Sequence, residues 1–90
     1  MKIENKELNL VYEGSLRKIF DSVVLEAGLC RISLKEAHDE EKGKIRKLGL
    51  AIGALSNILS DAIQCEYITE SVEERMKNCG WIMSVGDKDG

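Results

Sequence analysis

The apolar residues of the central segment 44–65 recur at the spacing of an α-helix. One apolar line along this segment consists of Ile45, Leu48, Ile52, Leu55, Leu59 and Ala62. With the apolar residues on either side of that line, the apolar positions from 48 to 63 cover roughly 220° of a helical wheel. The rest of the wheel holds mainly glycine and serine. The pattern predicts a long helix that must be covered on nearly every side.

A second helical pattern begins after Gly14, where Ser15 is a good N-cap residue. Its apolar stripe consists of Leu16, Phe20, Val23, Ala27, Cys30, Leu34 and Ala37. The spacing alternates between four and three residues without a break, so one continuous helix from 15 to about 40 would present this stripe.

A competing interpretation divides this stretch into two helices. Gly28 followed by Leu29 is typical of a helix end, and Ser33 with Glu36 forms a capping box that would begin a new helix. A glycine inside a helix costs only about 1 kcal/mol, so tertiary packing can override such a stop signal. Between the two, we favour a break near 28–33.

The last helical pattern covers 71–79, beginning at a capping box that Ser71 opens. Gly80 follows this segment and suits the left-handed conformation that ends many helices. We therefore predict that Trp81 folds back over the last helical turn, near Met76.

Two short stretches near the ends of the sequence have strand-like patterns. Residues 8–12 alternate between the two faces of a strand, and residues 81–85 read as an extended piece that could pair with them. We expect residues 1–7 and 86–90 to be flexible. The sequence thus predicts one mainly α domain over 1–90. Three to four helices pack in it as antiparallel helical hairpins or a small bundle, with a minor pairing of two terminal strands.

Composition narrows the class of protein. The chain has 90 residues, 43% of them hydrophobic, no proline and a net charge of -3. These values are typical of a soluble globular domain, and the absence of proline favours long helices. The longest uncharged run, residues 48–60, is too short to span a membrane, and no signal-peptide pattern is present. A cytoplasmic protein without a membrane segment is the expectation, and the acidic balance disfavours a nucleic-acid-binding stripe.

The chemistry-bearing residues are sparse. Cys30, Cys65 and Cys79 form no C-x-x-C motif, and His38 is the only histidine. Scattered thiols of this kind are typically reduced and buried, so we expect all three to be shielded from solvent. A nucleophile needs a neighbouring base, and no credible pair is visible. We predict no catalytic residues, no metal and no cofactor.

The long apolar helix suggests self-association, because a 90-residue chain has too little other surface to cover it. The predicted oligomer interface consists of Leu48, Gly49, Leu50, Ile52, Gly53, Ala54, Leu55, Ile58 and Leu59. Leu50, Ala54 and Ile58 are expected to be its exposed patch. The candidates for contact with a partner or a phosphate are Lys42, Lys44, Arg46 and Lys47.

These observations favour a small cytoplasmic protein–protein interaction module that acts without catalysis as a homodimer or larger homo-oligomer. Regulators, adaptors and inhibitors, including those of phages and mobile elements, are proteins of this kind. The alternative is a helix-turn-helix DNA-binding transcriptional regulator that uses residues 33–47. Another protein is thus the favoured partner, and nucleic acid is the second.

Overall fold

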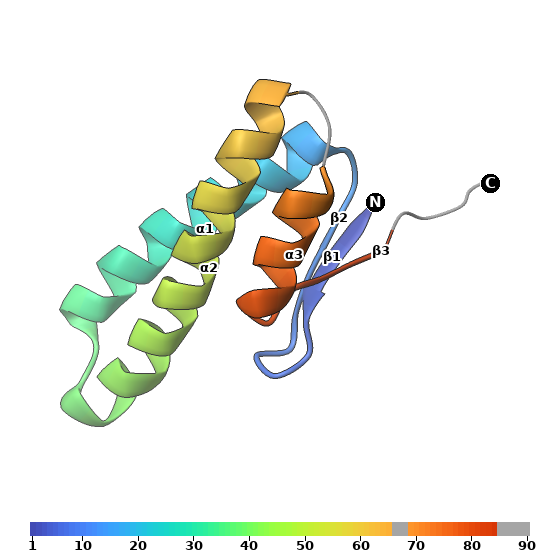
Figure 1. Cartoon of the computed structure of the whole chain (residues 1–90). Helices are drawn as coiled ribbons and strands as arrows, with labels where there is room; N and C mark the ends of the chain where they lie inside the picture. The colour runs from blue at the N-terminus through green and yellow to red at the C-terminus, as the bar shows by residue number, and fades with distance from the viewer. Residues whose placement is uncertain (66–68, 85–90) are drawn as a thin grey trace.

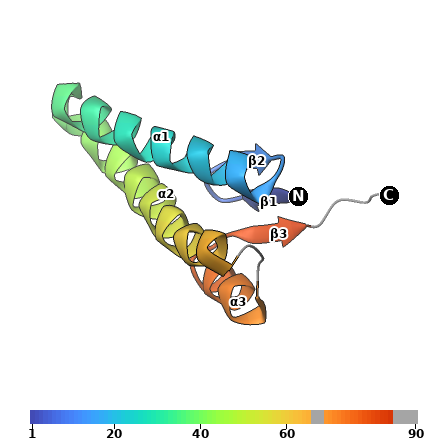
Figure 2. The same ribbon diagram turned by 90° about the horizontal axis from the view of Figure 1, so that it is seen from above.

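The computed structural model describes residues 1–65 and 69–84, without the side chain of Cys65. Over these residues the fold is mainly α, with three helices and a small antiparallel sheet (Figure 1). In chain order the elements are β1 (Lys2–Asn5), β2 (Leu10–Glu13), α1 (Leu16–Glu36), α2 (Asp39–Cys65), α3 (Glu70–Asn78) and β3 (Ile82–Ser84). Helices α1 and α2 form an antiparallel hairpin, and the sheet and α3 lie at its open end (Figure 2).

Helix α1 is continuous, so the expected break near 28–33 is wrong. Gly28 lies inside the helix, and Leu29 is exposed instead of folding back on a helix end. Ser33 is likewise inside the helix, so it does not begin a new one. The stripe on both sides of Gly28 packs against α2, and this packing outweighs the low helix propensity of one glycine. The N-cap is confirmed, because the Ser15 hydroxyl accepts a hydrogen bond from the Lys18 amide at 3.1 Å.

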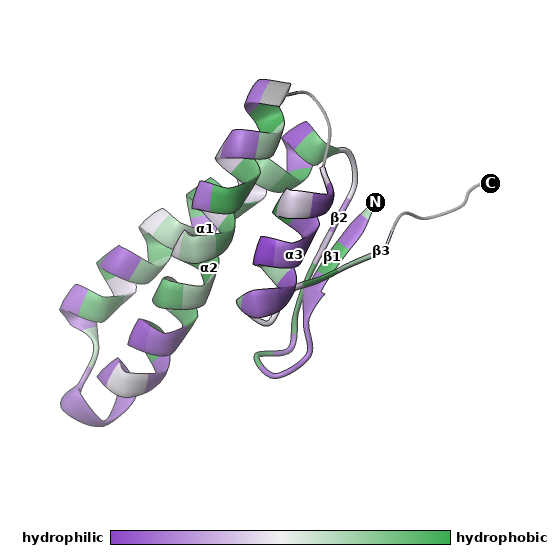
Figure 3. Cartoon of the chain, in the orientation of Figure 1, coloured by the Kyte–Doolittle hydropathy of each residue, from purple (hydrophilic) through white to green (hydrophobic). Residues whose placement is uncertain are grey.

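Helix α2 begins at Asp39, earlier than residue 44, because the charged connector is itself helical. The carbonyl of His38 accepts hydrogen bonds from the amides of Glu41 and Lys42, which close the first turn. The first turn is therefore acidic, which is favourable at the positive end of a helix dipole. The tip of the hairpin is mostly hydrophilic (Figure 3).

The N-terminal segment forms the central strand of the sheet, so the expectation that residues 1–7 are flexible is wrong. Strand β1 pairs with β2 on one side and with β3 on the other, both antiparallel. Ile3 faces Tyr12 in β2 and Met83 in β3. The terminal stretches predicted to pair with each other are thus the two edges, separated by β1. Residues 86–90 lie outside the described residues.

Helix α3 is preceded by Thr69 as its N-cap, not by Ser71. The Thr69 hydroxyl accepts a hydrogen bond from the amide of Val72 at 3.2 Å. The predicted glycine stop is present: Gly80 has a positive φ of 88°. The amide of Trp81 donates to the carbonyl of Met76 at 2.8 Å, which is the hydrogen bond of a Schellman motif that spans six residues.

Trp81 contacts both the sheet and helix α2, and it follows directly after the end of α3. Its side chain is fully buried, and its ring centroid lies 5.9 Å from that of Tyr12 in β2. Its indole Nε1 donates a hydrogen bond to the carbonyl of Ala51 in α2 at 3.2 Å. The prediction that Trp81 folds near Met76 is confirmed, and the side chain also ties α2 to the sheet.

Replacing Gly80 with valine is expected to lower the free energy of unfolding by about 1 kcal/mol or more, because a β-branched residue resists positive φ. Chemical denaturation followed by circular dichroism measures the change. Gly43→Val is the matched control, since Gly43 lies in helix α2 where an added Cβ would meet nothing within 4 Å. Identical denaturation curves for the two variants would refute the left-handed cap.

Candidate functional site

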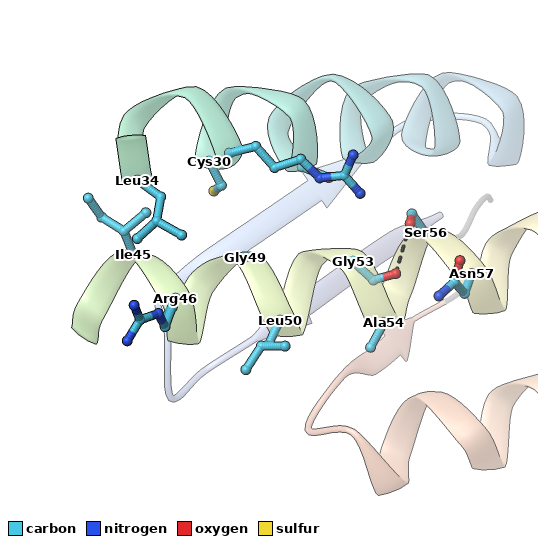
Figure 4. A pocket seen from close by; sticks show the side chains of 12 residues that line it. Cys30, Leu34, Ile45, Arg46, Gly49, Leu50, Gly53, Ala54, Ser56 and Asn57 are labelled. Atoms are coloured by element: carbon cyan, nitrogen blue, oxygen red, sulfur yellow. Dashed lines mark hydrogen bonds between the residues drawn. The ribbon is translucent and has the colours of Figure 1, made fainter. Parts of the chain in front are cut away.

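A groove of about 560 Å³ runs between helices α1 and α2. Helix α1 contributes Ala27, Cys30, Arg31 and Leu34, and helix α2 contributes Ile45, Arg46, Gly49, Leu50, Gly53, Ala54, Ser56 and Asn57. Figure 4 shows that Leu34 and Ile45 point toward one another near the hairpin tip, whereas Leu50 points away from α1. The lining is mainly apolar, which favours an apolar occupant.

Two glycines of α2 shape this groove. A Cβ added at Gly49 would lie 3.6 Å from the Cβ of Cys30, so the two helices approach closely there. A Cβ added at Gly53 would meet nothing within 4 Å, so the space beside Gly53 is open. The Ser56 hydroxyl donates to the carbonyl of Gly53 at 2.8 Å, which satisfies the serine within its own helix. The groove is therefore closed at Gly49 and open at Gly53.

The charged side chains that line the groove are both arginines, Arg31 from α1 and Arg46 from α2. Both are exposed, and within residues 1–65 and 69–84 neither forms an ion pair. The groove thus combines an apolar lining with two free positive charges. An occupant that carries carboxylates beside an apolar face would match it.

The predicted oligomer-interface residues divide into two groups. Those buried in the core of the single chain are Ile52, Leu55, Ile58 and Leu59. Those that line the groove are Gly49, Leu50, Gly53 and Ala54, and Leu48 is half-buried against the core. Ile58 is therefore not part of an exposed patch, because α3 lies against α2 and supplies more cover than the sequence pattern implied. Among the described residues, Leu50 is the most exposed large apolar side chain, at 75%.

The predicted basic cluster does not form one surface. Lys42 pairs with Asp39, and Lys47 pairs with Glu7 in the turn between β1 and β2. Arg46 lines the groove. Because α2 begins with an acidic turn, these basic residues follow the helix N-terminus instead of surrounding it. Two of the four basic side chains therefore already have acidic partners.

Residues 33–47 form the tip of the hairpin and not a helix-turn-helix. Helix α1 ends at Glu36 and α2 begins at Asp39, and the two helices then pack side by side (Figures 1 and 2). A helix-turn-helix instead sets its two helices at a large angle, so that one can enter the major groove of DNA. The antiparallel packing of α1 and α2 therefore differs from that motif.

The thiols differ in their surroundings. Cys79 is exposed and Cys30 is half-buried at the groove, so the expectation that all three are shielded is wrong for Cys79. Cys79 is the C-cap residue of α3, and its side chain is exposed at the end of that helix. Burial raises the pKa of the Cys30 thiol, and the nearby Glu26 carboxylate raises that pKa further. The side chain of Cys65 lies outside the described residues.

We expect Cys79 to react with a thiol reagent faster than Cys30 at pH 8, because the thiolate is the reactive form and Cys79 is more accessible. The comparison uses single-thiol variants in which the other two cysteines are replaced by serine. Labelling at equal rates would contradict the difference in exposure. Denaturing each variant should remove the difference and serves as the control.

Tyr12 also lies close to Glu26. Its hydroxyl donates a hydrogen bond to the Glu26 carboxylate at 2.9 Å. Burial and this hydrogen bond hold the pKa of the Tyr12 phenol well above its ordinary value. The phenol therefore stays protonated and acts as a structural donor that ties β2 to α1.

The sequence did not identify the α1 wall of the groove. Ala27, Arg31 and Leu34 are spaced four and three residues apart and share one helical face only if α1 is continuous. The expected break near 28–33 separated them. The alternative of one continuous helix from 15 to about 40 would have placed this wall opposite the glycines of α2.

In the described ranges, no group of three or more histidine, cysteine, aspartate or glutamate side chains is arranged to hold a metal ion. None of the described helices is both long enough and apolar enough to cross a membrane. Comparisons with protein-family models, with curated proteins and with solved structures found no significant match.

Proposed function

We propose that the protein is a non-catalytic protein–protein interaction module of the cytoplasm, a regulator, adaptor or inhibitor that acts as a homo-oligomer. Its groove between α1 and α2 would take an amphipathic helix of a partner protein. The observation that supports this is an apolar groove to which the described residues contribute Arg31 and Arg46 and no acidic side chain.

A helix is the partner segment that suits this groove best. Two long helices form its walls, and an amphipathic helix can lay its apolar face between them with side chains at i, i+4 and i+7. Carboxylates flanking that face would meet Arg31 and Arg46. The open space beside Gly53 leaves room for one large apolar side chain.

A binding measurement with designed peptides tests this proposal. The probe is a fluorescent helical peptide with leucines at i, i+4 and i+7 and flanking glutamates, and its control carries lysines in place of the glutamates. On the full chain, we expect the glutamate peptide to bind at least about tenfold more tightly, since like charges oppose binding of the other. Equal binding of the two peptides would overturn the charge complementarity.

Variants of the protein locate the binding surface. Gly53→Leu fills the groove at a position where an added Cβ meets nothing within 4 Å, and Arg46→Glu reverses an exposed charge. Both are expected to weaken binding of the glutamate peptide without changing the circular dichroism spectrum. Lys44→Glu, at an exposed residue that does not line the groove, is the matched control. Unchanged binding by Gly53→Leu would place the peptide elsewhere.

DNA binding through 33–47 is the competing hypothesis from the sequence. Titration of duplex DNA distinguishes the two hypotheses, because binding through phosphates weakens steeply above about 0.2 M salt. We expect no saturable binding of DNA, given the net charge of -3 and the antiparallel hairpin. Salt-sensitive, saturable binding would support the DNA-binding hypothesis instead.

A further inference from the structure

Helix α1 carries a second apolar surface, on the side that faces away from α2. This outer stripe consists of Leu25, Leu29 and Ile32, which are 65%, 51% and 57% exposed. Residues spaced i, i+4 and i+7 share one helical face. The buried residues of α1, Ile19 and Val23, lie on the other side. Figure 2 shows α1 along the edge of the molecule, with no described element outside it.

The outer stripe ends in opposite charges. Lys18 lies seven residues before Leu25, and Glu36 lies four residues after Ile32, so both continue the same line along the helix. Both side chains are exposed, and in the described part of the chain neither has an ionic partner. From the N-terminal to the C-terminal end of α1, this face therefore presents a positive charge, the outer stripe and a negative charge.

This order of charges matches a second copy of the same helix in the antiparallel direction. When Leu25 faces the partner's Leu29, Lys18 faces the partner's Glu36, because both pairs are centred on residue 27. A two-fold axis at residue 27 repeats each contact. In a parallel pair, by contrast, Lys18 would face lysine and Glu36 would face glutamate, which is unfavourable.

A neighbouring row of α1 supports the same direction. Asp21, which pairs with Arg17 at 3.8 Å in its own helix, and Lys35 are both exposed. In the antiparallel pair they oppose each other within one residue of the same centre. Between them lies Gly28, where an added Cβ would meet nothing within 4 Å, so no side chain separates the two helices there. With the axis at residue 27, Lys18 thus meets the partner's Glu36 and Leu25 meets the partner's Leu29. Ile32 then lies opposite the partner's Ser22.

We infer that the protein forms a two-fold symmetric dimer through the outer stripe of α1, paired antiparallel with its copy. This inference rests on the homo-oligomer of the proposed function and moves its surface from α2 to α1. The groove lies on the α2 side of the same helix and stays accessible in each copy. One dimer would therefore present two grooves.

Sedimentation equilibrium of the full chain at micromolar concentrations tests the dimer. We expect a mass of twice 10.0 kDa for the wild-type chain and of 10.0 kDa for Leu29→Glu. Leu29 is exposed, so the variant should keep the wild-type circular dichroism spectrum. Leu50→Glu, on the exposed edge of the groove, is the matched control and should remain a dimer.

Charge reversal tests the antiparallel register. Lys18→Glu and Glu36→Lys are each expected to weaken the dimer about tenfold or more, since each creates two like-charge contacts. The double variant Lys18→Glu/Glu36→Lys restores both opposite-charge contacts and should dimerise as the wild type does. Failure of the double variant to recover would overturn the register.

The outcomes separate this inference from the proposed function. A dimer that survives Leu29→Glu overturns the α1 surface but keeps the homo-oligomer. A monomeric wild-type chain at 100 µM overturns both the surface and the homo-oligomer, and binding of the glutamate peptide would still support the groove.

Discussion

Replacing Trp81 with alanine is expected to lower the free energy of unfolding by about 3–5 kcal/mol. Small domains have a total stability of about 5–15 kcal/mol, so this loss would leave the protein close to its unfolding threshold. The effect is large because one side chain packs on Tyr12, donates to Ala51 and lies fully buried after α3. No smaller residue can fill that volume.

Urea denaturation followed by circular dichroism measures the change, because Trp81 is the only tryptophan and fluorescence would be lost with it. Trp81→Phe is the matched control: it keeps an aromatic ring against Tyr12 but removes the hydrogen bond to the Ala51 carbonyl. We expect it to be destabilised less than the alanine variant. If Trp81→Ala unfolded at the same urea concentration as the wild type, the central role of this side chain in the core would be refuted.

Ile3→Ala is expected to lower the free energy of unfolding by about 2–5 kcal/mol, although it lies near the start of the chain. Ile3 is fully buried in the central strand, where it faces both Tyr12 and Met83. Its truncation leaves a cavity beneath the helices and weakens both edges of the sheet. Thermal and urea unfolding curves give the change in stability.

Val11→Ala is the control for Ile3, because it truncates a β-branched residue of the same sheet on the opposite face. Val11 is exposed and lies opposite Glu4, so we expect its loss to change stability by less than about 1 kcal/mol. Equal losses for the two variants would show that β1 is not packed under the helices.

The helices were predictable where a periodic pattern coincided with a clear local signal. The apolar line from Ile45 to Ala62 lies within α2 as expected. Ser15 and Gly80 marked a helix start and a helix stop, Ser15 through its hydrogen bond and Gly80 through its backbone angle. At each of these positions the local preference and the tertiary packing agree. Where local preference and tertiary packing agree, the structure can be predicted from the sequence.

Other elements depend on contacts between distant residues. Strand β1 has one deeply buried apolar residue, Ile3, and such a short pattern is indistinguishable from a polar tail until its two partner strands are known. Gly28 favours a helix end locally, but packing against α2 overrides it. Thr69 and Ser71 are both adequate cap residues by type, and the structure has Thr69 at the cap, with an extended backbone.

Of the candidate site, the α2 wall could be predicted from the sequence, whereas the α1 wall was missed. Leu50, Gly53 and Ala54 were identified from the apolar wheel of α2. The facing wall, with Arg31, lies on one face of a continuous α1, and the expected break near 28–33 concealed it. The sequence also assigned the extra apolar surface to α2, whereas α1 carries more of it.

The position of β1 between β2 and β3 sets an order for folding during synthesis. Lys2 can pair with Glu13 as soon as the first hairpin leaves the ribosome, but its pairing with Ser84 must wait until nearly the whole described chain has been made. Closing so long a loop is slow compared with forming the α1–α2 hairpin, whose contacts are closer in sequence. Until then, one edge of β1 and the cavity that Trp81 fills stay open. A nascent chain is thus most prone to aggregation just before β3 appears.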